Sequence, residues 1–454
     1  MAHKRKWFAW CPQPQTPIFG VLRQYSKPIL SLVTGGVIIV ALVMASGLAF
    51  SPSLSPIPFL HASPTPTMTP DPVASATPTP QSAIKPQTTG YPSVPQPSAP
   101  SPSPTPIPTW HTETVGKSEW ILTYPSLALD SNGNPHISWG NIENCLMYAS
   151  RNGTGWHIQT VDKSTFEDLG NASLIAVGRY SSLAIDSKGY PHISYSNYTR
   201  FGMNSYLSDL KYAWWNGTAW NIQKVDSGKA GECCSLVLDS NDRPHICYFQ
   251  FGDSKGKLIY ATQTGTNWTF ETVDSVYDDN DGTYDTSIAL DSAGRPHICY
   301  LPLRHSNLKY AVRTSTGWTT QVVEPNGVDN SRPSIALDST DRPHISYACQ
   351  NPRGPHGAMN CNIKYARWDG TGWNTQIIEA DWASNSALVL DSKDNPLISF
   401  DADGEVYYAE WDGATWNVIL MRSGAAGPML ALDSFGQLHM SYATGEGVKY
   451  AYSS

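Results

Sequence analysis

Three features of the sequence predict an all-β fold, a seven-bladed β-propeller with four antiparallel strands in each blade. A pattern typified by SLALDSNGNPHISW returns seven times, and its first Asp recurs every 42 to 56 residues. Each repeat holds four short strand-like segments, and one more such segment precedes the first repeat. A period of about 40 to 50 residues with four strands per unit is typical of a propeller blade.

The four strands of a repeat follow one another in a fixed order. SLALD alternates apolar and polar residues and ends in a turn of the form D-S-x-G/D-x-P, rich in the residues that tight turns require. PHISY is the second strand, because proline is tolerated at the first position of a strand. The third strand resembles LKYA from Leu210, and the fourth has the form W-x-x-Q/E-x-V, as in WHIQTV from Trp156.

The seventh repeat lacks its fourth strand, since the sequence ends at Ser454 soon after the third strand, VKYAYSS. The unassigned segment WHTETV, residues 110–115, matches W-x-x-Q/E-x-V and begins with Trp110. We therefore expect this N-terminal strand to complete the last blade. An unclosed ring would leave two exposed sheet edges, which proteins avoid.

The residues before the repeats divide into three segments. Residues 1–28 contain five basic and no acidic residues and are expected to be cytoplasmic. Residues 29–50 are uncharged and mainly apolar, and as a helix they would span roughly 33 Å, enough for a bilayer core of about 30 Å. Residues 51–108 are rich in Pro, Ser and Thr, a composition that predicts a disordered stalk.

This arrangement predicts a single-pass protein of the cell membrane, with residues 109–454 forming a propeller outside the cytoplasm. The alternative is a cleaved signal peptide, which would release a secreted protein. Beyond residue 50, 25 basic residues face 38 acidic ones, a net charge of about −13 that argues against nucleic acid as a partner. We expect a monomer.

The LDSxGxPHISY units resemble a family of exported bacterial propeller-repeat proteins, loosely grouped with the sialidase-type, BNR-repeat propellers. The resemblance covers residues 109–454 and implies a propeller outside the cytoplasm. The Asp-box of that group, S-x-D-x-G-x-T-W, is not present, so the resemblance does not extend to glycosidase activity. In blade number and in its Trp- and Gly-rich turns the protein is also similar to propeller lectins, which bind a sugar between blades.

An Asp and a His recur six residues apart in six of the seven repeats, where they would face each other across the first hairpin. A His oriented by a carboxylate can act as a general base. A catalytic group is needed once, however, whereas a bond that pins a hairpin is needed in every blade, so we interpret the pairs as structural and predict no catalytic residue. The pairs are Asp130/His136, Asp186/His192, Asp239/His245, Asp291/His297, Asp338/His344 and Asp433/His439.

The Trp that opens each fourth strand is interpreted as a wedge between blades, and a sugar-stacking platform is the alternative. Two tryptophans outside this register, Trp215 and Trp382, are predicted to be exposed ligand contacts. The adjacent basic residues Arg304 and His305 would bind an anion or be solvated.

Four acidic residues, Asp278, Asp279, Asp281 and Asp285, fall close together in SVYDDNDGTYD. Such a density of oxygen ligands suits Ca²⁺, the one cofactor the sequence suggests. A solvated acidic turn is the alternative, because the segment lacks the full EF-hand pattern.

The cysteines are consistent with export. Cys349 and Cys361 bracket the loop CQNPRGPHGAMNC, so a disulfide between them is predicted. Cys145, Cys233 and Cys234 have no assigned role.

No nucleophile elbow, P-loop or dinucleotide fingerprint is found. The sequence thus favours a binding module for a glycan, a cell-wall polymer or a surface protein, with a pocket near the long segments that begin at Ser164 and Ser196. The alternative is a glycoside hydrolase or lyase whose carboxylates come from several blades and converge on the central channel.

Overall fold

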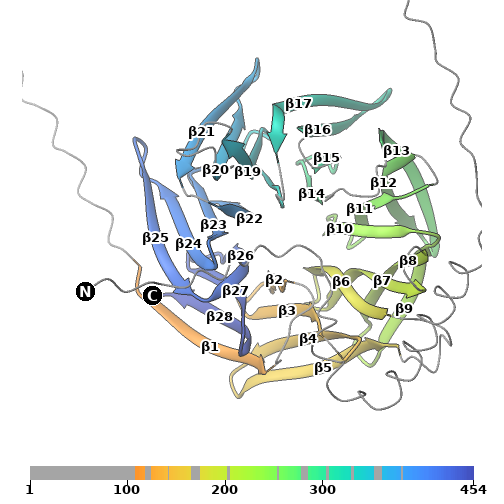
Figure 1. Ribbon diagram of the computed structural model, residues 1–454. Helices are drawn as coiled ribbons and strands as arrows, with labels where there is room; N and C mark the ends of the chain where they lie inside the picture. Colours follow the sequence, from red (N-terminus) through yellow and green to blue (C-terminus); the bar gives the residue numbers. More distant parts are fainter. Residues whose placement is uncertain are drawn as a thin grey trace, which may run out of the picture. The chain divides into compact units, whose positions relative to one another are not determined.

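A computed structural model describes residues 108–117, 124–141, 143–164, 174–201, 205–252, 255–277, 285–302, 306–328, 332–351, 360–379 and 382–454. These residues form 28 strands in seven four-stranded antiparallel sheets, which are arranged as a ring around a central axis (Figure 1). The predicted seven-bladed propeller is therefore confirmed.

The first four blades each use four consecutive strands, listed from the axis outward. Blade one is β2 (Ser126–Leu129), β3 (Pro135–Gly140), β4 (Cys145–Asn152) and β5 (Gly155–Lys163). Blade two is β6 (Leu174–Ile185), β7 (Pro191–Phe201), β8 (Ser205–Trp215) and β9 (Trp220–Asp226). Blade three is β10 (Ala230–Leu238), β11 (Pro244–Gln250), β12 (Lys255–Thr264) and β13 (Asn267–Tyr277). Blade four is β14 (Asp285–Leu290), β15 (Pro296–Leu301), β16 (Ser306–Thr314) and β17 (Gly317–Val328).

The last three blades complete the ring, and the seventh takes its outermost strand from the N-terminal side. Blade five is β18 (Ser334–Leu337), β19 (Pro343–Asn351), β20 (Asn360–Trp368) and β21 (Trp373–Glu379). Blade six is β22 (Ala383–Leu390), β23 (Pro396–Ala402), β24 (Glu405–Trp411) and β25 (Trp416–Ser423). Blade seven is β26 (Ala425–Leu432), β27 (Leu438–Thr444), β28 (Gly447–Ser453) and β1 (Trp110–Lys117).

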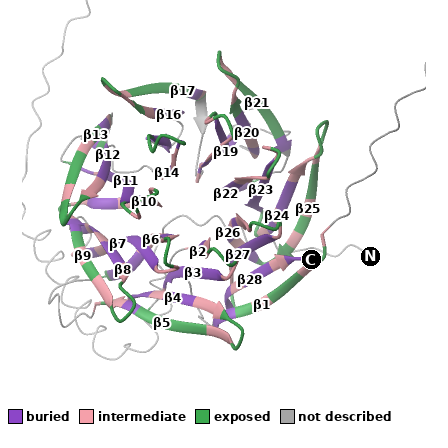
Figure 2. Ribbon diagram, turned by 180° about the vertical axis from the view of Figure 1, so that it is seen from behind, coloured by how far each residue is buried: buried purple, intermediate pink, exposed green. Residues whose placement is uncertain are grey.

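The N-terminal strand β1 closes the ring, as the sequence predicted. β1 pairs antiparallel with β28, with Trp110 opposite Ser453 and Lys117 opposite Gly447. Val115 of β1 is buried in a cluster with Ile137 and Trp139 of blade one, so the strand also joins the last blade to the first. Burial is greatest on the second strand of each blade and least on the outermost one (Figure 2).

The repeated tryptophans lie between blades. Each one packs against the Tyr of the third strand of a neighbouring blade, with ring centroids 5.2–5.8 Å apart and mostly edge-on, a geometry that aromatic pairs prefer. The tryptophans therefore fill the space between neighbouring blades, as the wedge interpretation predicted. The pairs are Trp110–Tyr408, Trp156–Tyr450, Trp220–Tyr148, Trp268–Tyr212, Trp318–Tyr260, Trp373–Tyr310 and Trp416–Tyr365.

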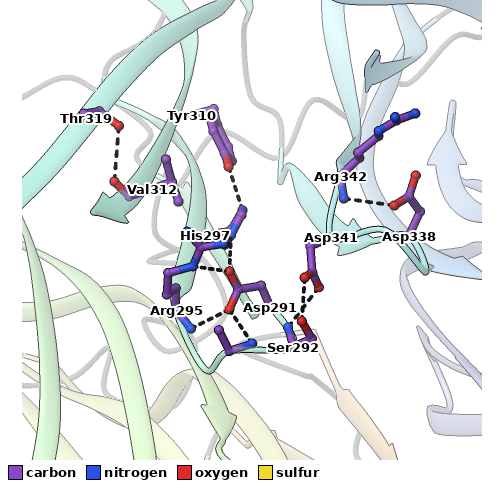
Figure 3. Close-up of polar contacts among 11 residues, drawn as sticks. Asp291, Ser292, Arg295, His297, Tyr310, Val312, Thr319, Asp338, Asp341 and Arg342 are labelled. Atoms are coloured by element: carbon purple, nitrogen blue, oxygen red, sulfur yellow. Dashed lines mark hydrogen bonds and ion pairs between the residues drawn. The ribbon is translucent and has the colours of Figure 1, made fainter. Parts of the chain in front are cut away.

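The Asp–His pairs meet as the spacing suggested, with His Nε2 and Asp Oδ2 3.4–3.9 Å apart in all six blades. The other ring nitrogen contacts the Tyr hydroxyl of the third strand, as for His297 and Tyr310 at 2.6 Å (Figure 3). Burial lowers the pKa of His297, so its imidazole is neutral at physiological pH. In blade six Leu397 replaces the His, and the Tyr408 hydroxyl donates to Glu410 instead, 3.1 Å away.

We expect His297→Leu to lower the free energy of unfolding by about 1–3 kcal/mol, because the buried Tyr310 hydroxyl loses its partner. Urea unfolding followed by tryptophan fluorescence measures this change. The double variant H297L/Y310F removes both partners and should recover part of the loss. An H297L protein as stable as the wild type would show that the contact does not pin the hairpin.

The predicted disulfide does not fit the register of blade five. Cys349 of β19 lies opposite Asn362 of β20, whereas Cys361 lies opposite Gln350. Successive side chains of a strand point to opposite faces, so the two cysteines face opposite sides of the sheet. The structure has both as thiols, and the disulfide prediction is corrected accordingly.

The predicted cytoplasmic segment and membrane span (1–50) and the stalk (51–108, save Pro108) lie outside the described residues. Within the described residues, no helix has the length and apolar character needed to cross a membrane.

Candidate functional site

The innermost strands bring one repeat position to the axis of the ring. In blade one, where the repeat SLALDSNGNPHISW begins at Ser126, this position is Tyr124, two residues earlier. The equivalent residues of all seven blades line a cavity of about 110 Å³, which we call the axial pocket. The hairpin motif that follows is similar in all seven repeats, whereas the side chains at this position differ in chemistry. The seven residues, from blade one to blade seven, are Tyr124, Tyr180, Cys233, Asp285, Arg332, Asn385 and Gly427.

Arg332 lies at the centre of this set. Its Nε is 3.7 Å from Asp285 Oδ1, and its guanidinium lies over the rings of Tyr124 (4.9 Å) and Tyr180 (5.5 Å). The Arg332 carbonyl accepts from the backbone N–H and hydroxyl of Ser386, which fixes the backbone of the arginine. A guanidinium has five N–H donors, and among the described residues Asp285 is the one acidic partner of Arg332.

Asp285 is a partly buried carboxyl group, 16% exposed, with perturbed acidity. Burial raises its pKa to about 7, and the Arg332 guanidinium and the Cys233 thiol oppose this shift only in part. Both protonation states are therefore populated near neutral pH. A residue with this property in a pocket is a candidate for a functional role.

Tyr180 carries a phenol that stays protonated. Arg179 donates a hydrogen bond to its hydroxyl (Nη2 to Oη, 3.2 Å), and burial raises the pKa of the phenol well above its ordinary value. At neutral pH Tyr180 is thus a hydrogen-bond donor with an aromatic face. It is not a general base in this state.

A buried carboxylate supports the opposite side of the pocket. Asp401 accepts hydrogen bonds from the backbone N–H groups of Asn385 (2.7 Å) and Gly427 (3.0 Å) and from the Ser384 hydroxyl (2.7 Å). A side chain at Gly427 would collide with the ring of Tyr124, since an added Cβ would lie 2.0 Å from that ring. Glycine therefore makes room for Tyr124 at the axis.

The residues that the sequence singled out are placed differently. Asp285 is in the axial pocket beside an arginine, whereas Asp278, Asp279, Asp281, Arg304 and His305 lie outside the described residues. No group of three potential metal ligands is present in the part of the chain that the structure describes, and the calcium prediction stays untested.

The two singled-out tryptophans lie at opposite ends of the blades. Trp382, 54% exposed and with a φ of +67°, precedes β22 and so lies at the end of the ring where the inner strands begin, as the pocket does. Trp215 packs against Trp220 at 5.7 Å, at the β8–β9 turn of the other end.

Sequence reasoning missed Tyr124, Tyr180, Arg332 and Asn385. The available signal was variation at one position: the residue two places ahead of each repeat is of six different types in seven blades. The predicted pocket near the segments from Ser164 and Ser196 is not the axial pocket, which all seven blades line, and residues 165–173 and 202–204 of those segments lie outside the described residues.

A second cavity, of about 650 Å³, lies between blades three and four. Its charged side chains satisfy one another: Arg313 forms a two-pronged pair with Glu271 (2.8 Å each), and Arg295 pairs with Asp291. A ligand would have to break these pairs. The axial pocket is therefore the stronger candidate.

Solved structures of other proteins share this fold. One is an ulvan lyase of polysaccharide lyase family PL25 bound to -[GlcA(1-4)Rha3S]- (TM-score 0.50, 14% identity, 74% of this chain and 93% of that chain). A Hadza microbial sialidase (TM-score 0.43, 14% identity, 62% and 64%) and the Aleuria aurantia lectin in complex with Fucα1-6GlcNAc (TM-score 0.44, 14% identity, 68% and 98%) are more distant. At such identities the likeness shows a propeller fold alone. The sequence matches no protein-family model and no curated protein.

Proposed function

We propose that this protein is a glycan-binding propeller whose axial pocket receives part of a saccharide. The observation that carries the proposal is the break in repeat symmetry at the axis, where Tyr124, Tyr180, Asp285, Arg332 and Asn385 replace one another at one repeat position. A scaffold position would keep one residue type through the ring, as the Asp–His pairs nearly do.

The chemistry of the pocket suits a sugar. Aromatic rings complement the C–H faces of a pyranose, while an amide, a carboxyl group and a guanidinium can bond its hydroxyls. The ulvan lyase that shares the fold is bound to a saccharide, which agrees with this ligand class. The expected membrane anchor and stalk would present the pocket to glycans or cell-wall polymers outside the cytoplasm, and both belong to this proposal.

Catalysis is the second candidate function, and one observation favours it. Asp285 is partly buried, its pKa is raised to about 7, and the protonated Tyr180 lines the same pocket. A carboxyl group that titrates near neutral pH can transfer a proton in either direction. The reaction would be cleavage of a glycan, by hydrolysis or by elimination.

One experiment tests both candidates. The full chain in a mild detergent is titrated against a panel of glycans and cell-wall polymers, and the same mixtures are assayed for released products. Saturable binding without products is the expected result. Released products would make the protein an enzyme, and no binding to any member of the panel would contradict the proposal.

We expect Gly427→Ala to weaken glycan binding roughly three- to tenfold, because the added methyl group displaces Tyr124 from the pocket. Gly424→Ala is the matched control: Gly424 has a similar φ (+71° against +60°) but nothing within 4 Å of its added Cβ. Equal affinities of the two variants would argue against a role for Tyr124. Thermal unfolding of both variants shows whether the fold is kept.

A further inference from the structure

A ladder of cationic and aromatic side chains crosses the end of the ring that holds the axial pocket. Each rung is a contact between a cation and a ring or between two rings, with separations of 4.7–5.5 Å. In order, the ladder is Lys229 on Tyr206, Tyr206 on Tyr198, Tyr198 under Arg179, Arg179 on Tyr180, Tyr180 under Arg332, and Arg332 on Tyr124.

The fold explains how the ladder extends beyond the pocket. Tyr198 and Tyr206 come from the hairpin of β7 and β8, whose strands have 11 residues each where β15 has six. β7 ends and β8 begins at the end of the ring where the inner strands begin. Arg179, next to Tyr180 on β6, links this hairpin to the axial pocket because it contacts Tyr198 as well as Tyr180.

Within the described part of the chain, the cations of the ladder have no closely paired carboxylate. Among the described residues, Arg332 has one ion pair, at 3.7 Å, and neither Arg179 nor Lys229 has any within 4.0 Å. Glu232 acts on Arg179 only from a longer distance. By contrast, Arg151 and Arg313 on the outer strands each hold a glutamate with two bonds of 2.7–2.9 Å.

The Arg332 side chain is partly buried. Arg332 is 29% exposed, and a guanidinium so far removed from water needs hydrogen-bond acceptors for its donors. Stacking on aromatic rings holds the guanidinium planes in place and leaves the N–H groups at their edges available for a two-pronged bond to an anion. A local row of cations in a chain with a net charge of −8 would also concentrate anions there.

We propose that the glycan is acidic, a saccharide with carboxylate or sulfate groups. One acidic group lies in the axial pocket against Arg332, and the chain continues over the β7–β8 hairpin toward Lys229. A pocket of about 110 Å³ accommodates one such group with part of its sugar, so the ladder outside it contacts the rest. This inference rests on the proposed glycan binding and names its substrate class.

The test compares acidic glycans with their neutral counterparts on the full chain, by isothermal titration calorimetry at low and moderate salt. The probes are polygalacturonate and its fully methyl-esterified form, and chondroitin sulfate and its desulfated, esterified form. The acidic member of each pair is expected to bind at least about tenfold more tightly, with an advantage that shrinks as salt rises.

Variants locate the interaction. Arg332→Ala should lower the affinity for the acidic probe by about ten- to a hundredfold, the effect of losing a charged hydrogen-bond partner. Arg332→Lys keeps the charge without the fork and should have an intermediate affinity, which keeps the test usable if the alanine variant fails to fold. Lys229→Ala should weaken binding of oligosaccharides but not of a monosaccharide. Arg313→Ala is the control and should have no effect.

The outcomes separate the two proposals. Equal binding of acidic and neutral forms, unchanged by R332A, would overturn the acidic-glycan inference and leave glycan binding in place. Acidic binding that R313A weakens as much as R332A does would place the site elsewhere and also overturn it. Binding of no glycan at all would overturn both.

Discussion

A chain from which residues 110–117 have been deleted is expected to lose cooperative unfolding. Without β1, the strand β28 becomes an exposed edge and blade seven has three strands. The deletion also removes the Trp110 wedge against Tyr408 and the buried Val115. The loss of this packing is expected to remove most of the free energy of unfolding, which is roughly 5–15 kcal/mol for a folded domain. Urea unfolding, followed by circular dichroism and fluorescence in parallel, measures the change.

A truncation that removes residues 1–107 and keeps β1 is the control, and it should unfold as the full chain does. Adding the peptide WHTETVGK in trans should restore part of the lost stability, because β28 presents the same hydrogen-bonding edge to it. If the deleted chain unfolds with the same midpoint and slope as the control, ring closure by β1 does not stabilise the propeller.

The fold could be predicted from the sequence because its signals are repeated. Seven copies of the hairpin signal reinforce one another, so an irregular copy such as the one with Leu397 does not obscure the pattern. Even the long-range pairing of β1 with β28 was predictable, since a missing strand and a spare strand of the same form imply each other. Repetition thus supplied long-range information that local propensity lacks.

The axial pocket could not be found in the same way, because its residues are those that do not repeat. Arg332 and Asp285 lie 47 residues apart, and only the ring geometry brings them within 3.7 Å. Closeness in the sequence groups Asp285 with Asp278, Asp279 and Asp281, and it gives no sign of the guanidinium that lies beside Asp285 in the fold. The disulfide between Cys349 and Cys361 failed for a related reason: closeness in sequence does not determine which face of a sheet a side chain occupies.

The side chains around Asp285 differ in how they respond to pH. Burial raises the pKa values of the Tyr124 and Tyr180 phenols and of the Cys233 thiol, so these groups remain neutral up to pH 8 and beyond. Arg332 and Arg179 remain cationic, and Glu232 is the other carboxyl group that acts on Asp285. Asp285 is thus the pocket group whose charge changes around pH 7.

We expect the affinity for an acidic saccharide to fall about tenfold between pH 6 and pH 8, in proportion to the fraction of Asp285 that is protonated. The neutral acid leaves Arg332 available to the ligand, whereas the carboxylate competes for it and repels the incoming anion. Titration calorimetry with chondroitin sulfate at several pH values measures this, since the sulfate stays ionised throughout.

Asp285 also makes the free energy of unfolding depend on pH. The pKa of Asp285 is higher in the folded state than the ordinary value of 3.8, so between about pH 4 and pH 7 the folded protein binds more protons than the unfolded chain. The contribution of Asp285 to the free energy of unfolding therefore falls as the pH rises through this interval. Asp285→Asn should remove this contribution and make binding equally tight at pH 6 and pH 8. If the variant keeps the wild-type pH dependence of both quantities, Asp285 does not control access to Arg332.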